Sequence, residues 1–587
     1  MAQRGFTTHP LVVRRLTVLR TREVTSRMRR ITLTGDDLRP FDRSGARQPG
    51  FASSAFDDHV KLVFTEGGDL AAALPVQLPH GIEWPPCPDR IARDYTPRRF
   101  DPDSGELDLD FVVHGHGPAV TWAQNAVPGD VLHIVGPKSS TVLPGDLDWI
   151  VLAGDETALP AIGRFLDERP IDVPARIALI ADPGAVQDEL VLREGDTIRW
   201  VHADPADPSA VEALIRDVVP DTGNGYVWCA GESRSLIPVR RFLKRERGLP
   251  KSHVNVTGYW HAEARGQASP APADAPAAPS AVASPLPWLV TRAALTMGVV
   301  DTVADAGTIG LAALAAKTGV PADRLRLMLD PLLGHGVLAG GEDGLGLGPF
   351  GERLIDDEHL REEFEGHHAD LLLALTELAP ALTADIPAWQ VRTGGTLRAR
   401  AEEDAETYAE LMESAESLAF NLGGLCADPL WGQVRRAIVT GPGSVAVVEA
   451  LTEAGHTPAI TVVEADVPST VLRAACADPG AVVWAASPPP ADVAVAVLAL
   501  GHRTDGEIAD LLTELRSAAP LAVLVDSSRP DALGPGAAET ALLGLAATSR
   551  PPRDGRAVAR LATAAGWRVE AVRPLGWGVE ATTLRAE

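Results

Sequence analysis

The run Arg93-Asp94-Tyr95-Thr96-Pro97-Arg98 brings together an aromatic ring, a small hydroxyl group and two guanidinium groups. If the run forms one strand, two-residue alternation turns Tyr95 and Pro97 to one face and Thr96 and Arg98 to the other. This combination suits a flavin dinucleotide, because one face can carry ring contacts while the Arg98 fork holds a diphosphate. An edge strand with a packed tyrosine and a solvated arginine has the same pattern. The run alone therefore leaves both interpretations open.

A glycine-containing loop follows a predicted strand within DFVVHGHGPAVTW, residues 110–122. The loop holds His114, Gly117 and Pro118 and leads into a helix that carries Trp122. Backbone N–H groups exposed at a helix N-terminus can receive a diphosphate. A plain connection between a strand and a helix, with exposed loop histidines, is the alternative.

Three further segments lie where predicted strands end: GDETALPAI at 154–162, VWCAGES at 227–233 and GYW at 258–260. In a parallel sheet, ligands bind outside the carboxyl ends of the strands. Thr157 is also a common type of helix N-cap, and two aromatic residues near the end of a domain usually pack. These segments are candidate parts of one site.

Composition limits the class of protein. With 587 residues the chain is too long for one hydrophobic core, and it has no apolar run near the ~18 residues of a membrane span. A formal net charge of -26 argues against a nucleic-acid partner, which needs clustered basic residues. The four cysteines form no CxxC pair, so we predict no zinc site, no disulfide framework and a cytoplasmic location.

The pattern of predicted strands and helices changes once within the first half of the chain. Residues 10–140, the Arg-rich segment 14–30 included, alternate as short strands, and DPDSG at 101–105 predicts a hairpin. From about residue 147, apolar strands alternate with helical stretches. We therefore predict an antiparallel β-barrel over 1–143 and a nucleotide-binding α/β domain over 144–262.

A segment rich in Pro, Ala and Ser over 263–285 is typical of an extended linker. Beyond it, Leu- and Ala-rich helices and the glycine-rich stretch 341–351 predict a winged-helix and helical domain over 286–435. Strands and helices alternate again over 436–587, which predicts a Rossmann-like α/β domain. The predicted fold class is multidomain: β-barrel, α/β, winged-helix and Rossmann-like.

Taken in order, DDHVKLVF at 57–64, RDYTPR, the HG…GP…W segment, GDETALPAI, the AGE segment and GYW resemble the siderophore-interacting proteins. These are FAD-containing ferric-siderophore reductases of the ferredoxin-reductase superfamily, and the resemblance covers about residues 10–262. It implies that Tyr95 lies against the isoalloxazine and Arg98 near the diphosphate. The full FAD set implied is Arg93, Tyr95, Thr96, Arg98, His114, Gly117, Pro118 and Ala119.

The resemblance also implies a nicotinamide site at Thr157, Ala158, Gly231 and Glu232, with Tyr259 and Trp260 close to the flavin. NAD(P)H would reduce FAD, and the flavin would pass single electrons to Fe(III) in a chelate whose Fe(II) form is held weakly. The substrate would be a ferric siderophore, commonly anionic. Lys61, Arg99 and Lys138 are candidates for its basic entrance, or are solvated surface charges.

Residues 286–351 resemble the N-terminal dimerisation domain of small-molecule O-methyltransferases, which implies a homodimer through the C-terminal half. In the following domain, Gly441 and Gly443 are two of the three glycines expected in a cofactor loop, and the leading acid is absent. Glu464 could bind ribose hydroxyls of S-adenosylmethionine. His502 occupies the family's general-base position, or has a capping or surface role.

Three hypotheses follow. The leading one is a flavin-dependent ferric-siderophore reductase whose methyltransferase-like half is degenerate and serves dimerisation or ligand binding. The second is a bifunctional enzyme whose second half is an active S-adenosylmethionine-dependent O-methyltransferase acting on a siderophore or another natural product. The third is a siderophore-binding scaffold without catalysis.

Overall fold

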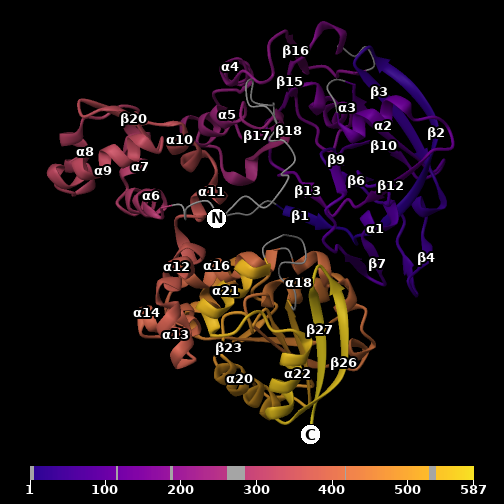
Figure 1. Ribbon diagram of the computed structural model, residues 1–587. Coiled ribbons are helices and arrows are strands. Elements are labelled where there is room, and N and C mark those ends of the chain that lie inside the picture. The colour runs from indigo at the N-terminus through magenta and orange to yellow at the C-terminus, as the bar shows by residue number, and fades with distance from the viewer. Residues whose placement is uncertain (1–4, 114–116, 186–189, 261–283, 417, 528–536) are drawn as a thin grey trace. The chain divides into compact units, whose positions relative to one another are not determined.

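The computed structural model describes residues 5–113, 117–185, 190–260, 284–416, 418–527 and 537–587 (Figure 1). It divides into two compact units. The first comprises Met1–Ala262, Leu411–Ala541 and Pro551–Glu587, and the second comprises Glu263–Glu410 and Leu542–Arg550. The helical region predicted over 286–435 is thus divided at residue 410, because the segment after it, including α17 (Gly423–Cys426), contacts α18 (Ser444–Glu453).

An antiparallel seven-stranded sheet forms the first part of the chain, in the order β10-β11-β3-β2-β12-β6-β9. The two edge strands, β9 and β10, follow one another in the sequence and are separated by Thr96 alone, so the sheet curls into a half-barrel. Alternating apolar residues, Leu16, Ile31, Leu107 and Leu132 among them, fill its core. The strands are β2 (Val13–Thr25), β3 (Met28–Thr34), β6 (Val60–Thr65), β9 (Arg90–Tyr95), β10 (Pro97–Asp101), β11 (Glu106–Val112) and β12 (Val131–Val135). The predicted hairpin at 101–105 joins β10 to β11.

The expectation of one continuous strand through residues 93–98 is wrong. Pro97 has no N–H to offer a ladder, and the chain turns at Thr96 from pairing with β6 to pairing with β11. Thr96, Pro97 and Arg98 are consequently all buried, without the predicted alternation of faces. The motif forms a corner of the barrel.

A parallel five-stranded sheet follows, in the order β16-β15-β14-β17-β18. Both faces are covered, as its continuous apolar strands require. The strands are β14 (Trp149–Gly154), β15 (Ala175–Ile180), β16 (Thr197–Val201), β17 (Gly225–Glu232) and β18 (Val254–Trp260), and the helices are α3 (Leu159–Glu168), α4 (Pro208–Val218) and α5 (Ile237–Arg241). The strand order reverses between β14 and β17, which makes their carboxyl ends the expected ligand crevice.

Hydrogen bonds and one ion pair join the barrel to this α/β lobe. Arg164 of α3 is 2% exposed and donates from Nη1 to Ser53 Oγ at 2.7 Å and from Nη2 to Ser53 O at 2.8 Å. Glu156 accepts from Arg27 Nε at 2.8 Å and from the Asp182 amide at 3.0 Å. The barrel and the α/β lobe are therefore joined by polar side-chain contacts as well as by the chain itself.

The second unit is helical, with a small hairpin. The helices α6 (Leu286–Thr296), α7 (Val299–Ala306), α8 (Leu311–Thr318), α9 (Ala322–Gly334) and α10 (Pro349–Asp356) enclose an apolar core with the hairpin of β19 (Leu338–Gly341) and β20 (Gly344–Leu347). This is a winged-helix arrangement. The helices α11 (Glu358–Glu362), α12 (Gly366–Ala374), α13 (Leu378–Ala384), α14 (Ala388–Thr393), α15 (Leu397–Glu403) and α16 (Ala405–Glu416) follow.

The C-terminal sheet has the order β23-β22-β21-β24-β25-β27-β26. Its first five strands are parallel in a Rossmann-like order, and β26 and β27 form an antiparallel hairpin at one edge, drawn in yellow in Figure 1. The strands are β21 (Arg436–Thr440), β22 (Ala459–Val463), β23 (Val483–Ala485), β24 (Val493–Val497), β25 (Leu521–Ser527), β26 (Trp567–Gly576) and β27 (Val579–Ala586), with helices α18, α19 (Asp466–Ala475), α20 (Asp505–Ala518), α21 (Ala537–Thr548) and α22 (Gly555–Ala564). Among the helices that the structure describes, none has the length and apolar content to cross a membrane.

Candidate functional site

Asp155 joins two of the segments that the sequence singles out. It lies just after β14, is 5% exposed, and its Oδ1 accepts from the Thr157 amide at 2.8 Å and the Thr157 hydroxyl at 2.5 Å. Its Oδ2 accepts from Trp260 Nε1 at 2.7 Å. The carboxylate thus caps the turn before α3 and fixes the indole at the end of β18. Thr157 is indeed an element of a helix start, and it also lies at the strand ends where a ligand would bind.

The backbone of β17 lies close to the Asp155 carboxylate. A Cβ at Gly231 would lie 2.8 Å from Asp155 Oδ2, so only glycine fits at this end of β17. Glu232 is 2% exposed and accepts from the Ser235 amide at 2.8 Å, and Ala158 is fully buried. Of the predicted nicotinamide set, Thr157 is half-buried at the strand ends, whereas Ala158, Gly231 and Glu232 are buried.

Tyr259 connects the lobe to the corner of the barrel. Burial of its phenol group and the nearby Asp57 carboxylate raise the pKa of Tyr259, and the side chain of Thr96 also lies near this phenol. Its ring meets Trp228 edge to face, with centroids 6.3 Å apart. Thr96 and Tyr259, which lie far apart in the sequence, thus meet at the junction of the two domains.

Asp57 is a member of this group that the sequence did not single out. Its Oδ2 accepts from Asn255 Nδ2 of β18 at 2.9 Å. Burial, and then the charge of Asp58, raise the pKa of Asp57. The two adjacent acids of the DDHV segment could have indicated this position. Asn255, which binds Asp57, lies nearly two hundred residues further along the chain, so no local pattern connects the two residues.

Tyr95 lies beside the same corner. Its half-buried ring is tilted against Phe111, with centroids 4.4 Å apart, and burial raises the pKa of Tyr95 to about 12. The phenol is therefore neutral at physiological pH and presents an uncharged ring, as contact with a flavin requires.

The two arginines of the motif have different environments. Arg98 is 5% exposed, its Nη1 pairs with Asp167 Oδ2 at 2.6 Å, and a Cβ at Gly163 would lie 2.8 Å from its Nε. The Arg98 fork expected to hold a diphosphate is thus directed into α3, because the chain turns at Thr96. Arg93 is exposed, and the bond described for its guanidinium is to the neighbouring Ala92 carbonyl at 2.9 Å. Of the two guanidinium groups in the motif, that of Arg93 is thus the exposed one.

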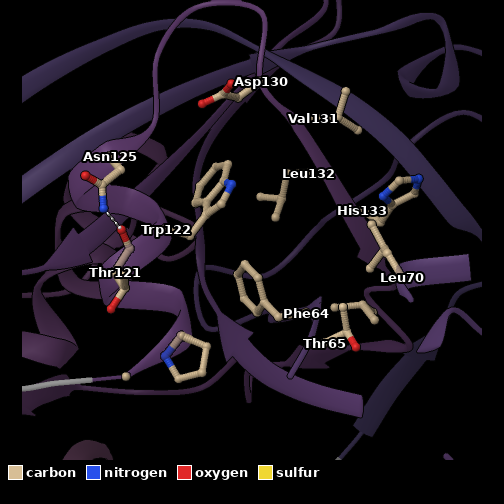
Figure 2. A pocket seen from close by; sticks show the side chains of 13 residues that line it. Phe64, Thr65, Leu70, Thr121, Trp122, Asn125, Asp130, Val131, Leu132 and His133 are labelled. Carbon is tan, nitrogen blue, oxygen red and sulfur yellow. Dashed lines mark hydrogen bonds between the residues drawn. The ribbon is translucent and has the colours of Figure 1, made fainter. Parts of the chain in front are cut away.

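The glycine loop leads to a cavity of about 770 Å³ (Figure 2). His114 lies outside the described residues. Gly117 and Pro118 begin α2 (Pro118–Asn125) and line the cavity, and a Cβ at Gly117 would meet no atom within 4 Å. Ala119 instead packs into the barrel core. Residues such as Phe64, Thr65, Trp122 and His133 complete the lining, and of these only Phe64 and Trp122 lie in segments that the sequence had indicated.

Two of the three predicted basic residues lie together. Lys61 and Lys138 both act on His59, whose pKa is lowered by burial and by these two charges and raised by Asp94 and Asp58. Lys61 also pairs with Asp94 at 2.9 Å. Arg99 is elsewhere, paired with Asp101 at 2.8 Å and near Asp108 at 3.8 Å. The basic residues near His59 are therefore Lys61 and Lys138, while the lowered pKa of His59 favours its uncharged form.

The candidate cofactor loop of the C-terminal domain is filled by the chain itself. A Cβ at Gly441 would overlap Val497 O, and one at Gly443 would overlap Val497 Cγ1. Glu464 Oε1 accepts from Thr440 Oγ1 at 2.9 Å and from the Gly441 amide at 2.5 Å. With the leading acid absent as well, this donor set does not fit S-adenosylmethionine. We derive no step through that cofactor.

His502 is buried, 5% exposed, and its Nε2 accepts from Arg503 Nη1 at 2.6 Å. Arg503 Nη1 also donates to Ala499 O at 2.8 Å. An arginine is permanently charged, so this contact favours the neutral imidazole and engages the nitrogen that a general base would need. The position predicted for the base is thus part of a buried network.

Comparison with known proteins identifies the first half. The model of the siderophore-interacting FAD-binding domain matches residues 17–141, and that of the siderophore-interacting protein matches residues 147–263. The NADPH-dependent ferric-chelate reductase of Escherichia coli (strain K12) is 33% identical over 253 residues, covering 43% of this chain and 93% of the relative. The chain belongs to the siderophore-interacting protein family.

Solved structures resemble both halves. A siderophore utilization protein from T. fusca is 38% identical and covers 45% of this chain and 98% of that one, with a TM-score of 0.39. The O-methyltransferase NcsB1 from neocarzinostatin biosynthesis is 23% identical and covers 52% of this chain and 97% of that one, with a TM-score of 0.42.

The residues present fit FAD. The exposed Arg93 guanidinium suits a phosphate, the neutral Tyr95 ring suits an isoalloxazine, and the open backbone at Gly117 leaves room for a ligand at the start of α2. Nothing comparable is found at the Gly441 loop.

Proposed function

We propose that this protein reduces ferric siderophores with electrons from NAD(P)H through a bound FAD. The observation that most supports this is the junction at β18, where Asn255 donates to Asp57 beside the barrel and Trp260 donates to the Asp155 carboxylate. A flavin on Tyr95 would there adjoin the carboxyl ends of β14 and β17, where a nucleotide is expected. FAD supplies the conversion of a two-electron hydride donor into a one-electron reductant of Fe(III).

The chain's own residues have separate tasks in this proposal. Arg93 holds phosphate, Tyr95 carries the flavin ring, and Asp155 keeps Thr157 and Trp260 in place for the nicotinamide. Lys61 and Lys138 attract the anionic chelate. The Fe(II) product leaves because hard oxygen ligands bind it weakly.

The test is reconstitution of turnover. We expect purified protein to bind FAD and, with NADPH or NADH and a ferric siderophore, to yield Fe(II) that a ferrous chelator traps. A protein that binds FAD and the siderophore without turnover would support the scaffold hypothesis instead. A protein that binds no FAD would contradict the proposal.

Arg93→Ala should weaken FAD binding by roughly 10- to 100-fold, the value of one or two charge-assisted hydrogen bonds. Arg39→Ala removes an equally exposed guanidinium and should leave FAD affinity unchanged. Arg98→Ala should lower thermal stability more than FAD affinity, because Arg98 is buried against α3. Flavin fluorescence quenching measures the affinities. Equal FAD affinity in wild type and Arg93→Ala would remove Arg93 from the site.

Lys61→Gln and Lys138→Gln should each raise KM for an anionic ferric chelate about 3- to 10-fold and leave KM for a neutral chelate unchanged. The difference between wild type and variant should shrink as salt is added, because salt screens exposed charges. Arg99→Gln is the matched control, since Arg99 lies on β10, at the opposite edge of the sheet from β9, and not beside His59 with the two lysines. If Arg99→Gln raises KM for the anionic chelate more than Lys61→Gln and Lys138→Gln do, the two lysines do not form its entrance.

For the C-terminal half, we propose dimerisation or ligand binding rather than methyl transfer. The self-filled Gly441 loop and the engaged His502 support this, and Leu286 and Leu289 of α6 are exposed apolar residues that a second copy could cover. Calorimetry should detect no binding of S-adenosylmethionine, and sedimentation equilibrium should give a dimer. Tight binding of S-adenosylmethionine would restore the bifunctional hypothesis.

A further inference from the structure

The C-terminal α/β domain contacts the barrel of the first half. Both belong to the first compact unit, which comprises Met1–Ala262, Leu411–Ala541 and Pro551–Glu587. Strand β26 contacts the small hairpin that β7 (Val76–Leu78) and β8 (Gly81–Glu83) form on the barrel. The two backbones come close together, because a Cβ at Gly576 would lie 2.5 Å from Ile82 O. The two parts of the unit are therefore packed directly on each other.

The turn between β26 and β27 presents a tryptophan to the barrel. Trp577 has a φ of 56°, which is rare for a bulky side chain, and Gly576 and Gly578 on either side also have positive φ. The Trp577 ring stacks on Trp84, with centroids 5.9 Å apart and planes 19° apart. Strained residues of this kind persist where the surrounding structure holds them in place. The packing of Trp577 against the barrel offsets the strain of this turn.

Trp577 also packs against an apolar cluster of the barrel. The buried members of this cluster are Leu11, Val13, Val63, Ile82 and Val135. Aromatic side chains that fill such a cluster contribute most of the energy of an interface. Val135 ends β12, and the chain continues from there to Lys138. The contact with the C-terminal domain is therefore close in sequence to a residue that we assign to the chelate entrance.

A second contact involves Lys138 itself. Lys138 Nζ lies 5.2 Å from the centroid of the Phe420 ring, within the range of a cation–π interaction. Phe420 is half-buried and lies in the short 3-10 helix Leu418–Asn421, which precedes the C-terminal domain. Lys138 is exposed, and an exposed lysine samples many rotamers unless a neighbour orders it. The Phe420 ring therefore restricts the position of this ammonium group.

We propose that the C-terminal domain is a working part of the reductase. It docks on the barrel through the turn that carries Trp577, and Phe420 then orders Lys138 at the entrance for the anionic chelate. This inference rests on the proposed function, which assigns that entrance. Phe420 is a positioning residue, because it acts through the charge of Lys138. This role for the methyltransferase-like fold requires neither S-adenosylmethionine nor a second copy of the chain.

Docking is tested by a designed disulfide. A Cβ at Gly423 would lie 3.7 Å from His80 Cβ, which is a suitable spacing for such a bond. His80→Cys with Gly423→Cys, in a chain whose Cys87 and Cys426 are replaced by serine, should form the bond under mild oxidation. His80→Cys with Gly432→Cys is the control, because a Cβ at Gly432 meets no atom within 4 Å. If mass spectrometry finds no link between positions 80 and 423, or an equal link in the control pair, docking is overturned.

The role of Phe420 is tested by steady-state kinetics with an anionic ferric chelate. Phe420→Leu removes the ring but keeps an apolar side chain, and it should raise KM about 2- to 5-fold, the value of one cation–π contact, with kcat unchanged. Phe420→Tyr keeps a ring and should retain the wild-type KM. In a Lys138→Gln chain, Phe420→Leu should raise KM no further, because no ammonium group remains for the ring to hold.

Two kinetic results would overturn the role of Phe420. One is an unchanged KM in Phe420→Leu, and the other is an equal rise in KM with and without the Lys138 ammonium group. A protein that reduces no ferric chelate contradicts the proposed function, and with it the role of Phe420, whereas the disulfide still decides the docking. The two failures are therefore distinguishable.

Discussion

Asp155→Ala should slow reduction of bound FAD by NADPH by about 100-fold, the cost of misplacing a reacting group by an ångström or so. The carboxylate holds the Thr157 amide and hydroxyl through Oδ1 and the Trp260 indole through Oδ2. Alanine releases all three at once, at the carboxyl ends of the strands where the nicotinamide is expected. Anaerobic stopped-flow absorbance of the flavin measures the rate.

The matched control for this variant is Asp207→Ala. Asp207 is also a helix N-cap of the α/β lobe and accepts from the Ser209 amide at 3.0 Å and hydroxyl at 2.7 Å, but it touches no strand end of the crevice. Its loss should leave the reduction rate unchanged. Similar slowing in both variants would mean that helix capping, and not the position of Thr157 and Trp260, determines the rate.

Gly443→Ala should destabilise the C-terminal domain by about 1–3 kcal/mol, because the added methyl group would overlap Val497 Cγ1. A glycine kept only for a ligand would tolerate the change in the absence of that ligand. Val497→Ala in the same chain should restore part of the loss by removing the overlapping methyl groups. Denaturant unfolding, followed by a probe within the C-terminal domain, measures both free energies.

Gly432→Ala provides the control, since a Cβ there meets no atom within 4 Å. It should change stability little. If Gly443→Ala is equally neutral, the loop is not filled by the chain, and the case against S-adenosylmethionine at Gly441 and Gly443 fails.

Local patterns predicted most of the secondary structure. Apolar runs that end in glycine or acid located β14, β15 and β17, and the DPDSG turn located the hairpin between β10 and β11. Strand β27 was missed, because VEATTLRA lacks the continuous apolar run of its neighbours and pairs only at the antiparallel edge. Short sequence patterns were sufficient to predict these elements, because the contacts that form them are local.

The site was less predictable, because its contacts are not local. The corner at Thr96 depends on β9 and β10 pairing with different strands, and that pairing turned Arg98 inward and left Arg93 exposed. Asp57 accepts a hydrogen bond from Asn255. The pKa of His59 is lowered by burial and by the charges of Lys61 and Lys138. No spacing rule connects such residues, whereas the ordered motifs did indicate which segments would meet.

The central claim is tested most directly by anaerobic reduction of the FAD-loaded protein followed by a ferric siderophore. The account predicts that NADPH or NADH bleaches the flavin absorbance, and that the chelate then restores it while a ferrous chelator traps two Fe(II) per flavin, because the flavin carries two electrons and each Fe(III) accepts one. A flavin that stays oxidised with both nucleotides, or that stays reduced after the ferric chelate is added, would contradict it.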